Sequence, residues 1–153
     1  MLSPLHIVQT TAQPTAVIHV TIAPEDMPTV IGPGIEEVMS VVAAQGIAPA
    51  GAWFVRVFTM DDATIDLEIG VPIASHITPA GRVQPGHLPA ATVARTIYRG
   101  PYEGLGNAWG AFTEQISAAG HAQADGFWDC YVKGPESTDN PDEWETELNK
   151  ILQ

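Results

Sequence analysis

The sequence predicts an α+β fold built from two tandem strand-helix-strand-strand repeats. The same order of apolar patterns occurs twice along the chain, and each helical pattern ends at a glycine, Gly46 in the first half and Gly120 in the second. Shifting the first half by 74 or 75 residues also superposes short strand segments, such as 20–22 on 95–97. Duplications of this kind usually pack about a pseudo-two-fold axis with a cleft between the halves.

The length bounds the number of domains. A chain of 153 residues with 45% apolar residues can bury one good core but is too short for two independent domains to be expected. We therefore predict a single domain over residues 1–153. It would hold repeat one at about 5–73, a connector at 74–86 and repeat two at about 87–152.

The first repeat begins with two segments rich in Val, Ile and Thr, 5–9 and 16–22, which predict one strand or two short ones. Apolar residues at steps of three and four then predict a helix over 28–45. Two strand-like runs, 53–60 and 64–73, surround a two-residue acidic turn and predict a hairpin.

The second repeat follows the connector, which holds two prolines, two glycines and little pattern. A strand is predicted over 88–98 and a helix over 101–119. The chain would then form a strand over 127–133, a loop rich in turn residues over 134–143 and a last strand over 144–152.

Charge limits the classes of partner. The 18 acidic and 6 basic residues give a formal net charge of -12, which disfavours nucleic acid and anionic membranes and favours cationic or neutral partners. No apolar run approaches the roughly 18 residues that span a bilayer, and the N-terminus lacks the pattern of a signal peptide, so we expect a cytoplasmic protein. Its single cysteine and scattered histidines form no metal-binding pattern, and no metal or cofactor is predicted.

Aromatic residues gather in the second repeat, around a lone strand carboxylate, Glu147. Strand alternation places Phe127, Asp129 and Tyr131 on one face of their strand. If Tyr131 and Glu147 face the same cleft, they offer a phenol and a carboxylate to one ligand. Aromatic rings with a carboxylate suit a lipophilic cation, because each cation-π contact contributes about 0.5 to 2 kcal/mol.

We therefore predict a small-molecule site. Core packing remains the alternative for Trp109, which lies on the apolar stripe of its helix, and a solvated position remains the alternative for both glutamates. The candidate ligand-binding residues are Glu147, Tyr131, Trp109, Trp144, Phe58 and Glu68.

Taken together, segments 97–102, 131–135 and 144–148 and the helix around Trp109 resemble the GyrI-like small-molecule-binding domains, the effector-binding domains of AraC- and MerR-type transcription activators. Segment 65–73 is similar to the matching part of the first repeat. The resemblance implies curved antiparallel sheets that flank a cleft for hydrophobic, often cationic molecules. It also implies that Glu147 contacts the ligand and that Tyr131 lines the cleft.

Three functions follow as expectations. The first is a freestanding multidrug-binding or effector-sensing protein. The second, implied by hydrolase members of the family, is hydrolysis of strained cyclopropane-type toxins by Glu147 with Tyr131. The third is a module that inhibits another protein. Because no helix-turn-helix segment is apparent and the charge opposes DNA, a regulatory role would need a separate DNA-binding regulator.

Overall fold

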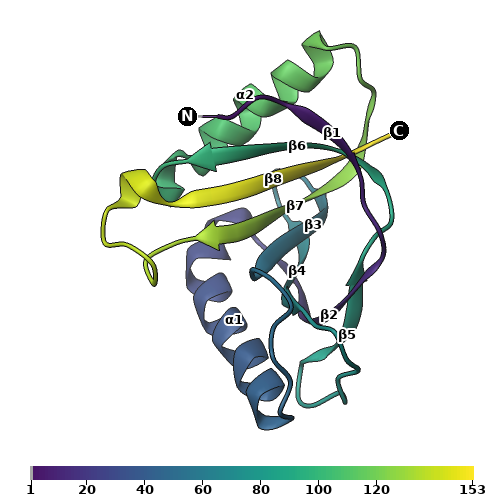
Figure 1. Cartoon of the computed structure of the whole chain (residues 1–153), viewed down its shortest axis with the longest axis vertical. Helices are drawn as coiled ribbons and strands as arrows, with labels where there is room; N and C mark the ends of the chain where they lie inside the picture. The colour runs from purple at the N-terminus through teal and green to yellow at the C-terminus, as the bar shows by residue number, and fades with distance from the viewer. Residues whose placement is uncertain (1) are drawn as a thin grey trace. The chain divides into compact units, whose positions relative to one another are not determined.

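The computed structural model describes residues 2–153, which fold into two compact units. The N-terminal unit comprises Thr11–Ala90, and the C-terminal unit comprises Ala91–Gln153 together with residues 2–10. Each unit contains one long α-helix and four antiparallel strands among the described residues. Figure 1 labels these elements.

The sheet of the N-terminal unit has the strand order β3-β4-β2-β5, with every neighbouring pair antiparallel. A short 3₁₀ turn, Pro24–Asp26, leads into the helix. The elements are β2 (Gln13–Ile22), α1 (Met27–Ala44), β3 (Phe54–Met60), β4 (Ile65–Pro72) and β5 (Gln84–Leu88).

The C-terminal unit repeats this plan in the order β7-β8-β6-β1. Its helix again follows a 3₁₀ turn, Tyr102–Gly104, and a third such turn, Pro141–Glu143, precedes the last strand. The elements are β1 (His6–Gln9), β6 (Thr92–Arg99), α2 (Leu105–Ala118), β7 (Gln123–Lys133) and β8 (Glu145–Leu152).

Each helix packs on one face of its own sheet through a stripe of residues spaced four apart. In α1 this stripe is Gly34, Val38 and Val42, and Val38 and Val42 join a core with residues of β2 and β4. In α2 it is Ala108, Phe112 and Ile116, packed on β6 and β8. The spacing predicted from the sequence therefore selects the buried face of both helices. We call the sheet faces that point away from the helices the α1-distal face and the α2-distal face.

The predicted α+β class, the duplicated strand-helix-strand-strand order and the antiparallel sheets are confirmed. The two N-terminal segments, left open as one strand or two, are separate strands. β1 pairs with β6 of the C-terminal unit, whereas β2 pairs with β4 and β5. A cleft between the repeats stays a prediction.

Among the elements that differ from their predicted bounds, β5 and β7 have a local cause. β5 lies in the segment expected to be a connector, and as an edge strand it tolerates Pro85 and Gly86. β7 begins at Gln123, four residues before the predicted start, and its register shifts between Gln123 and Phe127. Gly126 lies in this shift with φ 97°, a conformation that glycine adopts most easily.

Candidate functional site

Glu147 lies in the middle of the C-terminal sheet, on β8 between β6 and β7. Its direct neighbours across the strands are Ile97 and Cys130. Leu148, the next residue along the strand, packs against α2, so Glu147 points to the α2-distal face. Its side chain is 23% exposed, which leaves the carboxylate accessible but partly removed from water.

The carboxylate of Glu147 is not the lone charge that the sequence suggested. Asn149 Nδ2 donates a hydrogen bond to Glu147 Oε1 over 3.1 Å, and Arg95 Nε lies 3.4 Å from the same oxygen. The Arg95 Nε–H group itself donates to Asn149 Oδ1 over 2.7 Å. Arg95, Asn149 and Glu147 thus form a connected polar group, and neither Arg95 nor Asn149 was singled out from the sequence.

The pKa of Cys130 is shifted by its surroundings near Glu147. Burial, together with the nearby carboxylates of Glu147 and Asp129, raises the pKa of its thiol to about 12. The thiol therefore stays protonated at neutral pH and is unsuited to act as a nucleophile.

Tyr131 lies on the other side of this sheet. It pairs with Thr146, whereas Glu147 pairs with Cys130, so the side chains of Tyr131 and Glu147 point to opposite faces. The structure does not bring these two predicted partners together. Hydrolysis by Glu147 with Tyr131 needs both groups on one substrate, and the register gives that pair no support.

On the α2 side, Tyr131 and Trp109 both donate hydrogen bonds to the carboxylate of Asp129. Strand alternation had placed Asp129 on the same face as Tyr131, but Asp129 was not among the predicted site residues. Trp109 Nε1 donates to Asp129 Oδ1 over 2.8 Å, and the Tyr131 hydroxyl donates to Asp129 Oδ2 over 3.2 Å. Asp129 is 7% exposed. Burial raises its pKa to about 7, although the two hydrogen bonds lower it. An acidic residue between Phe127 and Tyr131 on a buried face is the pattern that could have identified it.

Trp144 connects the same side to the loop before β8. Its ring stacks on Tyr102 with a centroid distance of 4.7 Å, and Tyr102 meets Tyr131 edge-on at 5.6 Å. Trp144 Nε1 donates to the carbonyl oxygen of Thr138 over 3.0 Å. Trp144 therefore anchors the 134–143 loop, and Trp109, Tyr131 and Trp144 gather on the α2 side rather than around Glu147.

In the N-terminal unit, Glu68 and Phe58 lie together on the α1-distal face. Glu68 pairs with His19 on β2 and with Arg56 on β3. The Arg56 guanidinium lies 4.4 Å from the centroid of the Phe58 ring. Burial raises the pKa of Glu68, while the positive charge of Arg56 opposes that rise. Glu68 thus occupies a central strand facing away from its helix, as Glu147 does, and it also has an arginine beside it.

Two pockets lie on these units. The first, of about 340 Å³, lies in the C-terminal unit and is lined by Leu2, Ser3, Ile97, Arg99 and Glu145. It borders the Glu147 position, since Ile97 is the direct cross-strand neighbour of Glu147. Its volume falls in the range of small-molecule sites.

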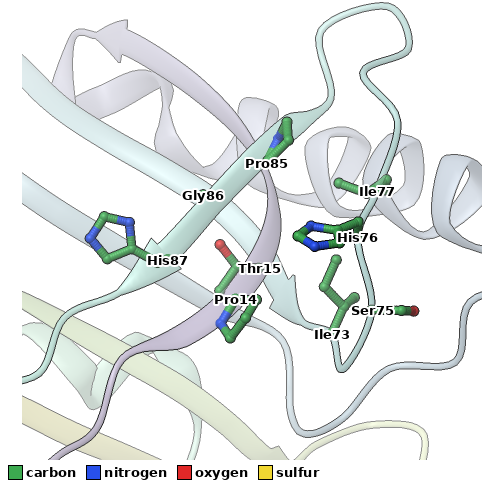
Figure 2. Close-up of a pocket in the computed structure, with 9 residues that line it drawn as sticks. All are labelled: Pro14, Thr15, Ile73, Ser75, His76, Ile77, Pro85, Gly86 and His87. Atoms are coloured by element: carbon green, nitrogen blue, oxygen red, sulfur yellow. The ribbon is translucent and has the colours of Figure 1, made fainter.

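The second pocket, of about 250 Å³, lies in the N-terminal unit and contains none of the predicted site residues. Figure 2 shows it between the crossing of β2 with β5 and the segment that carries Ile73 and Ile77. Thr15 lines it, and the Thr15 hydroxyl oxygen is buried with no hydrogen-bond partner among the described residues.

Within residues 2–153, no group of three or more His, Cys, Asp or Glu side chains is arranged to hold a metal ion. No helix in the same part of the chain is long and apolar enough to cross a membrane.

The duplicated α+β plan places a glutamate on a central strand of each unit's sheet. The chain matches the model of the GyrI-like small-molecule-binding domain over residues 3–149. The chain therefore belongs to the GyrI-like family, and its resemblance to that family is confirmed. A search of curated protein sequences returned no match.

Solved structures with the same fold include an isolated C-terminal domain, a complex with DNA and a ligand complex. The C-terminal domain of EcmrR matches with a TM-score of 0.83 at 16% identity, covering 98% of this chain and 97% of that one. In the complex of EcmrR with DNA the TM-score is 0.82 at 16% identity, covering 98% of this chain, which spans 57% of the EcmrR chain. SAV2435 bound to tetraphenylphosphonium matches with a TM-score of 0.68 at 10% identity, covering 99% of this chain and 94% of that one. At these identities the similarity shows the fold alone.

Proposed function

We propose that the protein binds lipophilic cations, as a multidrug-binding or effector-sensing domain, with Glu147 as the charged partner of the ligand. The observation that carries the proposal is the position of Glu147. Its carboxylate is partly exposed on the α2-distal face, and its cross-strand neighbour Ile97 lines a pocket of about 340 Å³ together with the apolar residue Leu2.

Three further findings support a cationic ligand. The family binds small molecules, and SAV2435, a relative in fold, has a structure with tetraphenylphosphonium, an apolar cation. The net charge of -12 attracts cations to the whole molecule. A carboxylate partly removed from water also interacts with a cation more strongly than a fully solvated one.

Phe58 and Glu68 belong to the proposal as a second set of ligand contacts, because they occupy the matching face of the N-terminal unit. That both glutamates line one cleft stays a prediction. Trp109, Tyr131 and Trp144 are proposed to support the fold of the C-terminal unit around Asp129 and the 134–143 loop, and only secondarily to meet a ligand.

Isothermal titration calorimetry with tetraphenylphosphonium tests the function. We expect Glu147→Gln, which keeps the shape of the side chain, to weaken binding by roughly tenfold, about 1.4 kcal/mol. Glu114→Gln is the matched control, because Glu114 is exposed on α2 and loses the same charge. Equal binding by both variants would show that Glu147 has no part in the site.

The cellular role is proposed more broadly. We place the protein in the cytoplasm and assign any transcriptional output to a separate DNA-binding regulator, since a net charge of -12 opposes contact with phosphates. Cell fractionation checks the location. A gel-shift assay with this chain alone checks the second point, and retarded DNA would contradict it. Inhibition of a partner protein stays a prediction that a pull-down can test.

A further inference from the structure

Arg95 is the closest positive charge to Glu147, yet its hydrogen bond goes elsewhere. Arg95 Nε donates to Asn149 Oδ1 over 2.7 Å, whereas its distance to Glu147 Oε1 is 3.4 Å. Asn149 is 0% exposed and on the same β8 strand as Glu147, so it is a rigid anchor for the guanidinium group. Arg95 is therefore held beside Glu147 by a neutral residue and does not depend on the carboxylate to stay there.

The N-terminal unit also places an arginine beside its central glutamate, on a different strand of the repeat. Arg56 lies directly across the strands from Glu68, and its Nη1 donates to the carbonyl oxygen of His87 over 2.8 Å. In both units an arginine is thus fixed by an uncharged acceptor next to the central glutamate. The two arginines lie on strands that do not correspond between the repeats, β3 for Arg56 and β6 for Arg95, so Arg95 acts through its own contacts with Asn149 and Glu147.

An arginine fixed beside the glutamate reduces the electrostatic attraction between the glutamate and a ligand cation. The pair Arg95–Glu147 has no net charge, so a ligand cation meets the attraction of the carboxylate and the repulsion of the guanidinium at similar range. A neutral ligand of the same shape experiences neither this attraction nor this repulsion. The presence of Arg95 therefore weakens the binding of cations relative to neutral molecules.

We propose that Arg95 is the specificity-determining residue of the Glu147 site, and that it allows neutral lipophilic molecules to compete with lipophilic cations there. This inference rests on the proposed function, because it concerns the same site and the same carboxylate.

Arg95→Gln is the variant that tests the role of the arginine charge. The Nε2 group of a glutamine is attached at the same point of the side chain as Nε of arginine, so Arg95→Gln keeps a donor for Asn149 Oδ1 while it removes the charge. Arg95→Lys keeps the charge and is the matched control. Thermal unfolding of both variants checks that they fold.

Calorimetry with two probes measures the preference: methyltriphenylphosphonium, a cation, and methyltriphenylsilane, a neutral molecule of the same shape with no hydrogen-bonding group. We expect Arg95→Gln to raise the ratio of cation affinity to neutral affinity by about tenfold. Arg95→Lys should leave the ratio near that of the parent. The double variant with Glu147→Gln should return the ratio to near that of the parent, because the two positions together again carry no net charge.

The outcomes separate the inference from the proposed function. A change in the ratio of less than about threefold in Arg95→Gln, with Glu147-dependent binding by the parent, overturns the role of Arg95 alone. Failure of the parent to bind either probe overturns the proposed function and the inference with it. A ratio that rises equally in Arg95→Lys would show that shape rather than charge is responsible, and would also overturn the inference.

Discussion

Trp109 and Asp129 are joined by a hydrogen bond of 2.8 Å from the indole Nε1 to the carboxylate Oδ1, and this bond ties α2 to β7. The second carboxylate oxygen of Asp129 accepts from Tyr131 over 3.2 Å. Neither bond comes from a cationic side chain, so Asp129 is a buried acid stabilised only by neutral donors. This relationship makes the stability of the C-terminal unit depend on pH.

Stability should fall as the pH rises from about 4 to about 7. Burial raises the pKa of Asp129 from 3.8 to about 7, so the folded chain keeps a proton that the unfolded chain has lost in this range. The stabilisation is complete below the unfolded pKa and is lost above the folded one. About three pKa units correspond to at most about 4 kcal/mol. Urea unfolding at a series of pH values measures it.

The matched variant for that experiment is Asp129→Asn. An amide oxygen can still accept from Trp109, and an amide N–H can donate to the hydroxyl oxygen of Tyr131. The difference in stability between parent and variant should therefore move in favour of Asp129→Asn as the pH rises. A difference that stays constant between pH 4 and pH 8 would contradict the assignment to Asp129.

Trp109→Phe should destabilise the fold by about 1 to 3 kcal/mol, because it removes a donor from a buried carboxyl group while keeping an aromatic ring. Trp144→Phe is the comparison. The Trp144 indole donates to a loop carbonyl in a half-buried position, and its loss should cost less than about 1 kcal/mol. Equal losses in chemical denaturation would argue that packing, not the hydrogen bond to Asp129, dominates at Trp109.

Thr15→Val should stabilise the N-terminal unit by about 1 kcal/mol. The Thr15 hydroxyl is buried without a partner among the described residues, and valine has the same shape without the desolvation penalty. Thr21→Val on the same strand is the control, since its hydroxyl donates to Asp66 Oδ1 over 2.9 Å. The idea fails if thermal unfolding shows Thr15→Val to be no more stable than Thr21→Val.

Gly70→Ala should prevent stable folding or cost more than about 2 kcal/mol. A Cβ atom on Gly70 would lie 2.6 Å from Val17 Cγ1 and even closer to the carbonyl oxygen of Ala16, which belongs to the paired strand and cannot move aside. Gly110→Ala, at an open position on α2, should instead add up to about 1 kcal/mol. Melting temperatures of the two variants should shift in opposite directions.

Much of the fold followed from local patterns. Apolar spacing along α1 and α2 predicted the buried stripes that include Val38 and Phe112, because a helix can bury only one face against a sheet. The repeat followed from element order and from the glycines that end both helices. The exchange of β1 into the C-terminal unit could not be predicted, because strand pairing is a long-range contact that a short Val- and Ile-rich segment does not specify.

The sequence by itself determined the class of the protein and the alternating faces of β7 and β8, and it singled out Glu147 as a candidate ligand contact. Only the tertiary structure decided which side chains come into contact on each face of these strands. A shift of one residue in the register between β7 and β8 would have placed Tyr131 beside Glu147, whereas the observed register pairs Cys130 with Glu147. The same register leaves Asp129 buried with Tyr131 and Trp109, and the pairing of β6 with β8 brings Arg95 to Asn149 and Glu147, because side chains far apart in sequence become neighbours only when the strands align.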